Sequence, residues 1–126
     1  MQRSSLPESG INLSLVVGVL RQAPVVRTGA DGEAVLSFDL AVRVPDLPLE
    51  SVPVVWSAAP SVAATWASGL EVLVIGRVRR RFFRAGGSTQ SRTEVLATSV
   101  IPTRRRVAAR RALEQVRQAI DPLGSP

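Results

Sequence analysis

The sequence contains no cysteine, histidine, lysine or tyrosine. Without cysteine there is no disulfide framework, no thiolate metal site and no catalytic thiol. The absence of histidine and lysine removes the commonest general acids and bases, Schiff-base chemistry and the lysine of a Walker motif. The ten acidic residues show neither tight pairing nor a metal-ligand spacing. We therefore expect a protein that is not an enzyme and that uses no metal ion or other cofactor.

Long apolar runs are also missing. No stretch approaches the ~18 uninterrupted apolar residues of a membrane span. The first ten residues are mostly polar, include Pro7 and lack the regions of a secretory signal peptide. These absences indicate a cytoplasmic protein without a membrane partner, and a length of 126 residues favours a single domain.

All sixteen basic residues are arginine, and their distribution is uneven. Residues 1–50 contain four arginines and six acidic residues, which gives a net charge of −2. Residues 51–126 contain twelve arginines and four acidic residues, which gives +8. The positive potential therefore belongs to the second part of the chain, where a polyanionic partner is expected to bind.

A long strand with arginines on one face is predicted from residue 70 onward. The apolar run 70–75 is rich in Val and Ile and continues into an arginine-rich segment. Because side chains alternate across a strand, one face should carry Arg77, Arg79, Arg81 and Phe83. The other face, with Val72, Val74, Val78 and Phe82, should be buried. Gly86 and Gly87 then provide a turn, and residues 90–101 return as a second strand.

A row of guanidinium groups that ends in an aromatic ring suits a flexible polyanion with flat bases. The cations meet phosphates, and the ring offers a stacking surface to any base. The spacing alone leaves an alternative open, because arginines on a strand also form ordinary solvated faces or protect a sheet edge against aggregation.

The earlier part of the chain predicts three more strands and a short helix. Strands are expected over 11–20, 33–44 and 52–57, and 25–28 resumes the first of them. In the second strand the buried face should be Leu36, Phe38, Leu40 and Val42. A helix is expected over 58–68, with Pro60 near its start, Gly69 at its end and Trp66 in the core. This order is typical of an OB-fold, an all-β, five-stranded Greek-key barrel with a helix between strands 3 and 4.

Three parts of the chain follow from this reading. Residues 1–10 should be a flexible arm, 11–102 the OB-fold domain, and 103–126 an arginine-rich C-terminal helix and tail. Thr103 is a candidate N-cap for a helix over 103–120, whose apolar stripe would be Ala109, Leu113, Val116 and Ile120. Three interpretations of this helix stay open: it docks on the barrel or frays, it adds phosphate contacts, or it mediates self-association.

Over residues 11–101 the chain resembles the bacterial single-stranded DNA-binding proteins in the order and spacing of its short motifs. The family's opening pattern corresponds to Asn12, Gly18, Leu20, Pro24 and Arg27. Its next blocks correspond to Gly32, Val35, Phe38, Leu40, Ala41 and Val42, and then to Trp66 and Gly69. Its later blocks correspond to Gly76, Arg77, Val78, Arg81 and Phe83, and to Thr93, Glu94 and Val95.

The resemblance implies an OB-fold that binds single-stranded DNA with little sequence preference, in replication, recombination or repair. It also implies a homo-oligomer, a dimer or tetramer, on the bacterial nucleoid. The implied contact residues are Arg77, Arg81 and Phe83, with Arg79 joining them by face parity. Trp56 falls where the family has an aromatic residue that contacts DNA, and a place in the barrel core is open to it as well. Candidate peripheral phosphate contacts are Arg27, Arg43, Arg84 and Arg92.

The chain also departs from the family pattern. Residues 44–55 lack the aromatic residues expected there, so stacking platforms are missing and binding should depend more on phosphate charge. An arginine-rich helix stands where the family has an acidic tail that recruits other proteins, so recruitment through such a tail is not expected. Two alternatives remain: an RNA-binding OB-fold, and a protein-interaction paralogue that forms mixed oligomers with a major single-stranded DNA-binding protein or a primosome.

Overall fold

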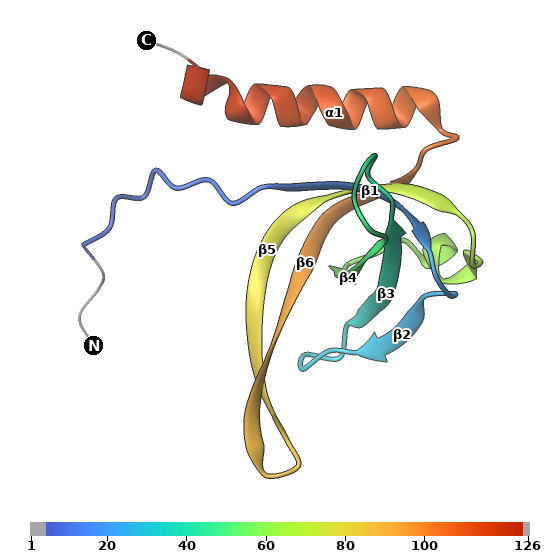
Figure 1. The fold of residues 1–126 in the computed structure, drawn as a ribbon, viewed down its shortest axis with the longest axis vertical. Coiled ribbons are helices and arrows are strands. Elements are labelled where there is room, and N and C mark those ends of the chain that lie inside the picture. Colours follow the sequence, from blue (N-terminus) through green and yellow to red (C-terminus); the bar gives the residue numbers. More distant parts are fainter. Residues whose placement is uncertain (1–4, 125–126) are drawn as a thin grey trace.

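The computed structural model describes residues 5–124, in which six strands, one α-helix and two short 3₁₀ helices occur (Figure 1). The strands are β1 (Ser14–Leu20), β2 (Val25–Thr28), β3 (Ala34–Val42), β4 (Glu50–Ser57), β5 (Glu71–Ala85) and β6 (Ser88–Pro102). The helices are η1 (Ser61–Thr65), α1 (Arg106–Ile120) and η2 (Asp121–Gly124). The prediction of a mostly β chain with a C-terminal helix is confirmed. Residues 1–4 and 125–126, at the ends of the predicted arm and tail, lie outside the described residues.

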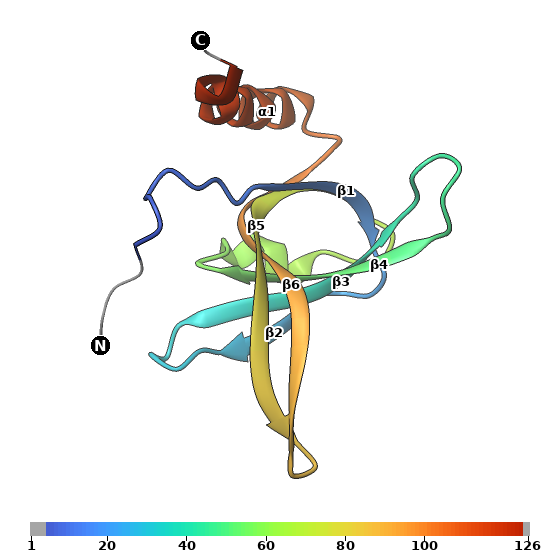
Figure 2. The ribbon, with the colours of Figure 1, turned by 60° about the vertical axis from the view of Figure 1, so that its left-hand side comes forward.

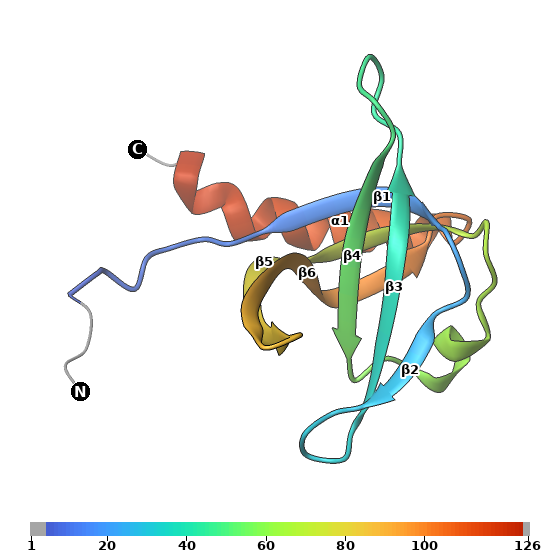
Figure 3. The same ribbon diagram turned by 60° about the horizontal axis from the view of Figure 1, so that its bottom comes forward.

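The strands form one sheet in the order β1-β5-β6-β4-β3-β2. All neighbours are antiparallel except β4 and β6, which pair in parallel at Val54–Val95 and the two following positions. β1 also pairs with β3, through Val19 opposite Ala41 and Leu20 opposite Leu40. The pairings therefore run from β1 through β5, β6, β4 and β3 and return to β1. Figure 3 shows β3 and β4 side by side, with β1 crossing them.

β2 lies outside this circuit and pairs only with β3. The sequence predicted residues 25–28 as a resumption of the first strand, whereas the structure makes them a separate sixth strand. The turn between β2 and β3 closes with a hydrogen bond from the Gly29 N–H to the Glu33 carbonyl, and Gly32 takes a φ of 83°. Only glycine adopts that angle without strain, which explains the turn at this point.

The core lies between the inner faces of the strands. The predicted alternation on β3 is confirmed, because Leu36, Phe38, Leu40 and Val42 are all buried. Trp56 on β4 and Trp66 after η1 stack with their ring centroids 6.0 Å apart. Trp56 belongs to the same core cluster as Ala63 of η1, and Trp66 packs against that cluster.

The helix predicted over 58–68 is wrong in type and length. Only η1 forms there, with 3₁₀ hydrogen bonds from Ala63 to Pro60 and from Trp66 to Ala63. Pro60 and Trp66, which flank η1, have extended backbones, so the turn cannot continue in either direction. As a result Val62 is 60% exposed, while Trp66 still packs against the core as predicted.

The hairpin of β5 and β6 extends beyond the rest of the sheet (Figure 2). Its tip is the predicted turn, with Gly86 and Gly87 at φ angles of 59° and 82°. The prediction that Val78 and Phe82 are buried is wrong, because these residues are 45% and 67% exposed. The alternation that places Val72 in the core continues along β5, but the core ends before residue 78, so the same face becomes solvent-exposed.

α1 packs on the outer side of β5 and β6. Ala109, Ala112 and Val116 contact a small cluster with Leu73, Ile75 and Ile101. Docking, the first of the three predicted interpretations, is therefore what the structure has, although Leu113 and Ile120 of the predicted stripe stay 42% and 39% exposed. Among residues 5–124, no helix combines the length and the apolar character that crossing a bilayer requires.

The predicted N-cap role of Thr103 is wrong. α1 begins three residues later, and its N-cap position is Arg105, without a side-chain cap. The Thr103 hydroxyl instead donates to the Glu71 carboxylate, at 2.6 Å, and the Thr103 N–H donates to the Glu71 carbonyl. These bonds hold the end of β6 to the start of β5 before the chain turns into α1.

A bulge in β6 allows β5 to bend at Gly76. Ile75 pairs with Ser99 and Gly76 with Ala97, so Thr98 is the extra residue on β6. A Cβ atom at Gly76 would overlap the carbonyl oxygen of Leu96 and lie 2.9 Å from the Ala97 Cα. Both are backbone atoms of the paired strand, which cannot rotate away.

Gly76→Ala should therefore lower the free energy of unfolding by about 3 kcal/mol, the upper end of the usual cost of overpacking. Gly10→Ala is the matched control, because no atom lies within 4 Å of its added Cβ. It should change stability by less than about 0.5 kcal/mol. Urea unfolding of both variants measures the difference, and equal effects would contradict the role of the close contact.

Candidate nucleic-acid interface

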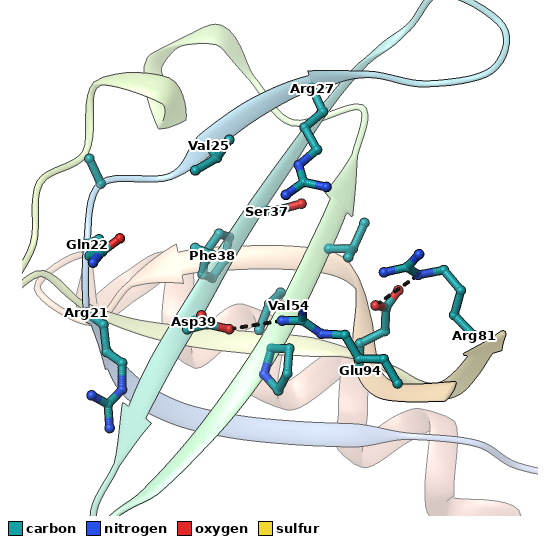
Figure 4. Close-up of a pocket in the computed structure, with 14 residues that line it drawn as sticks. Arg21, Gln22, Val25, Arg27, Ser37, Phe38, Asp39, Val54, Arg81 and Glu94 are labelled. Atoms are coloured by element: carbon teal, nitrogen blue, oxygen red, sulfur yellow. Dashed lines mark hydrogen bonds and ion pairs between the residues drawn. The ribbon is translucent and has the colours of Figure 1, made fainter. Parts of the chain in front are cut away.

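A pocket of about 230 Å³ lies on the outer face of β2, β3, β4 and β6. We call it the arginine pocket, after the four arginines that line it: Arg21, Arg27, Arg81 and Arg92. Its floor is formed by outward-facing residues of β3 and β4, among them Ser37, Asp39 and Val55. Figure 4 shows the labelled arginines around β3, from three different parts of the chain, with α1 behind the sheet.

Two arginines from β5 share one carboxylate beside this pocket. Arg79 donates through Nε and Nη2 to Glu94 Oε2, at 3.1 and 2.8 Å. Arg81 donates through Nε to Glu94 Oε1, at 3.3 Å. Glu94 is 2% exposed, whereas the two arginine side chains are 37% and 43% exposed. The carboxylate is thus enclosed, and the guanidinium groups remain at the surface.

Arg81 also lies over an aromatic ring. Its guanidinium carbon is 5.1 Å from the centroid of Phe83, two positions further along the same face of β5. The positive charge and the electron-rich ring face attract each other at this distance. The pair forms a flat, cationic surface next to the arginine pocket, which is suited to a planar ligand that carries negative charge nearby.

A second ion pair crosses the pocket. Arg92 on β6 donates to Asp39 on β3 at 3.4 Å, and both side chains are about half exposed. At that exposure the pair contributes little to stability. It places a carboxylate within the positive pocket and limits the net charge there.

The structure brings together most of the predicted site residues. Arg27, Arg81 and Arg92 line the pocket, and Arg79 adjoins it through Glu94. Phe83 is partly buried next to Arg81. Arg77 is exposed on the same strand, two positions before Arg79.

Two predicted contacts lie elsewhere. Arg43 is exposed at the end of β3, in a shallow hollow that it shares with Leu15 and Glu71. Arg84 lies at the hairpin tip, where its Nη2 donates to the Gly87 carbonyl at 2.9 Å. Neither residue lines the arginine pocket.

Trp56 is part of the core. It is 6% exposed and stacks on Trp66, so no ring face is open to a base. Of the two places that the sequence left open for it, the core is the one that the structure has. The prediction that Trp56 contacts DNA is therefore wrong, because β4 turns this residue toward the inner face.

Sequence reasoning missed Arg21, Asp39 and Glu94. Arg21 lies in the break after β1, where no strand alternation predicts the direction of its side chain. Glu94 had a readable signal: counting outward from a two-residue turn at Gly86 and Gly87 places it opposite Arg79, and this is the observed register. An acid opposite an arginine on one face of a hairpin indicates a cross-strand ion pair.

No protein-family model matches the chain, and no curated protein matches it significantly. The function is therefore inferred from the chemistry of the arginine pocket and the residues around it.

Trp56→Phe tests whether Trp56 serves the core and not the DNA contact. Because Trp56 is buried, the smaller ring should leave a cavity and lower the free energy of unfolding by about 1–3 kcal/mol. Affinity for a labelled single-stranded oligonucleotide, measured by anisotropy well below the melting temperature, should stay within about twofold, since the surface is unchanged. A large loss of affinity with unchanged stability would return Trp56 to the contact residues.

Proposed function

We propose that the chain is a divergent OB-fold protein that binds single-stranded DNA along the arginine pocket, with little sequence preference. The observation that carries this proposal is the Arg81–Phe83 pair beside a pocket lined by four arginines. Cationic grooves with adjacent aromatic rings are how sequence-tolerant single-strand binders work, since every base has a face to stack and every nucleotide a phosphate.

The strand circuit supports the OB-fold part of the proposal. Five strands close on one another through the pairing of β1 with both β5 and β3, and η1 lies before β5, where that fold has its helix. β2 is an addition at the edge of β3. In OB-folds the outer face of the central strands is the usual nucleic-acid surface, and the arginine pocket lies on such a face.

The pocket's size and shape favour unpaired bases over a duplex. At about 230 Å³ it is smaller than the ~300–1,000 Å³ of a typical small-molecule site, so it suits one or two bases of a strand that continues across the surface. A duplex presents phosphates but hides its base faces. Phe83 therefore contributes to single-strand binding alone, and the arginines contribute to both.

This activity fits roles in DNA replication, recombination or repair in a bacterial cytoplasm. An RNA ligand is the weaker candidate. Phe38 lines the pocket but is only 6% exposed, which leaves Phe83 as the ring next to the pocket that a base can reach, and the chain has only five aromatic residues in total. Parallel titrations with dT and rU oligomers of equal length separate the two ligands.

One observation favours a protein partner in addition to DNA. β1 pairs with β5 along its length but with β3 only at Val19 and Leu20, so no described strand pairs with its other edge over residues 14–17. Leu13, Leu15 and Val17 are 38–49% exposed beside that edge. We propose self-association here, as a dimer or tetramer; mixed oligomers with a fuller relative are the alternative, and native mass spectrometry distinguishes them.

The double variant Arg21→Ala with Arg27→Ala tests the phosphate contacts. Each lost contact should shallow the slope of log affinity against log salt by about 0.7 for a single strand, so the pair should shallow it by about 1.4. Arg110→Ala with Arg111→Ala removes the same charge from α1, behind the sheet, and should leave the slope unchanged. Equal shifts in both double variants would show that charge alone, and not this pocket, governs binding.

Phe83→Leu tests the stacking contact. Binding to a dT oligomer should weaken by about 1–3 kcal/mol, the usual contribution of one stacked base. Binding to an abasic strand of the same length should not change, because it has phosphates but no bases. Phe82→Leu, on the opposite face of β5, is the matched control. If Phe83→Leu weakened both ligands equally, its effect would be structural and not due to stacking.

A further inference from the structure

Glu94 occupies an unexpected place for a negative charge. It is enclosed, at 2% exposed, in the surface proposed to bind a polyanion. Its neighbours in the pocket include two apolar residues of β4, Pro53 and Val55. A charge in such surroundings carries a desolvation cost, which its ion pairs have to offset.

The stability of the fold does not explain why a charged residue stands at Glu94. Replacing a buried ion pair by apolar residues of similar size is often neutral or stabilising, so the pair is weak evidence of a contribution to stability. Val95 and Ala97 already pack into the core from the other face of β6. The contacts of Glu94 are instead with Arg79 and Arg81, both on the proposed binding face.

Particular nitrogen atoms of the two guanidinium groups make these contacts. Glu94 accepts hydrogen bonds from the Nε–H groups of both arginines and from the Nη2 group of Arg79. Within residues 5–124, the two Nη groups of Arg81 have no hydrogen-bond partner. Arg81 is held by Glu94 through its Nε, and its guanidinium lies over the Phe83 ring. A planar guanidinium with fixed donors loses less entropy for each hydrogen bond that it forms with a ligand.

We propose that Glu94 is a positioning residue that holds Arg79 and Arg81 in place and thereby makes the surface select unpaired bases over duplex phosphates. This inference rests on the proposed function. By compensating one of two positive charges, Glu94 lowers the attraction for any polyanion, single or double stranded. By fixing Arg81 on Phe83, it preserves the flat surface that only an unpaired base can use. The second effect is the one that favours single strands.

Glu94→Gln is the principal test, because it keeps the size of the side chain and removes its charge. The ratio of single-strand to duplex affinity should fall at least about fivefold, near the lower end of what one stacked base contributes. Duplex affinity should itself increase. In the free protein, the ¹⁵N–¹H signals of the Arg79 and Arg81 Nε groups should be sharp in the wild type, and at least one should broaden in the variant.

Two further variants separate positioning from charge. Asp39→Asn removes the same charge in the same pocket but releases only Arg92. It should therefore raise single-strand and duplex affinity together and keep their ratio within about twofold of the wild type. Glu94→Asp keeps the charge but is one methylene shorter and cannot reach both arginines. It should lose the affinity ratio as Glu94→Gln does, and it decides the matter if Glu94→Gln does not fold.

The outcomes are distinguishable. If the wild type bound single strands and the folded Glu94→Gln variant kept both the affinity ratio and sharp Nε signals, the positioning role would be overturned while the proposed function stood. Equal losses of the ratio in Asp39→Asn and Glu94→Gln would also overturn it, in favour of charge alone. If the wild type failed to bind single strands at low salt, the proposed function and this role would fall together.

Discussion

The close approach of β5 and β6 at Gly76 is the constraint on which the rest of the structure depends. With no side chain at that position, the two strands stay paired across the bulge, and β5 changes its surroundings there. Before Gly76 the strand supplies Val72 and Val74 to the core; after it, the strand supplies arginines to the surface. A single 15-residue strand can therefore contribute both to stability and to the proposed DNA surface.

The positive surface is organised by the few carboxylates that it contains. Three of the arginines near the pocket form ion pairs, two with Glu94 and one with Asp39. Arg21 and Arg27 form none among residues 5–124 and provide the uncompensated charge. The ion-paired arginines thus lie on the β4 side of β3, and Arg21 and Arg27 lie on its β2 side. A bound strand would meet ordered guanidinium groups and the Phe83 ring on the first side, and positive charge alone on the second.

Local patterns predicted those features that depend on neighbours in sequence. The alternation of Leu36, Phe38, Leu40 and Val42 gave the buried face of β3, and the Gly86–Gly87 pair gave the hairpin turn. Face parity also grouped Arg79, Arg81 and Phe83 correctly. Parity cannot tell where a strand leaves the core, however, which is why Phe82 was wrongly expected to be buried. Trp56 was ambiguous for the same reason: only the tertiary partner, Trp66, decides that its ring points inward.

The enclosed Trp56–Trp66 stack has a practical consequence for solution work. These are the only two tryptophans in the chain, and both contribute to the core. Intrinsic fluorescence should consequently report the loss of tertiary structure on denaturation. It should respond little when a strand occupies the arginine pocket, because Trp56 is buried and stacks on Trp66. Folding and ligand occupancy can then be followed in one cuvette through separate signals, the indole emission for the first and a dye on the oligonucleotide for the second.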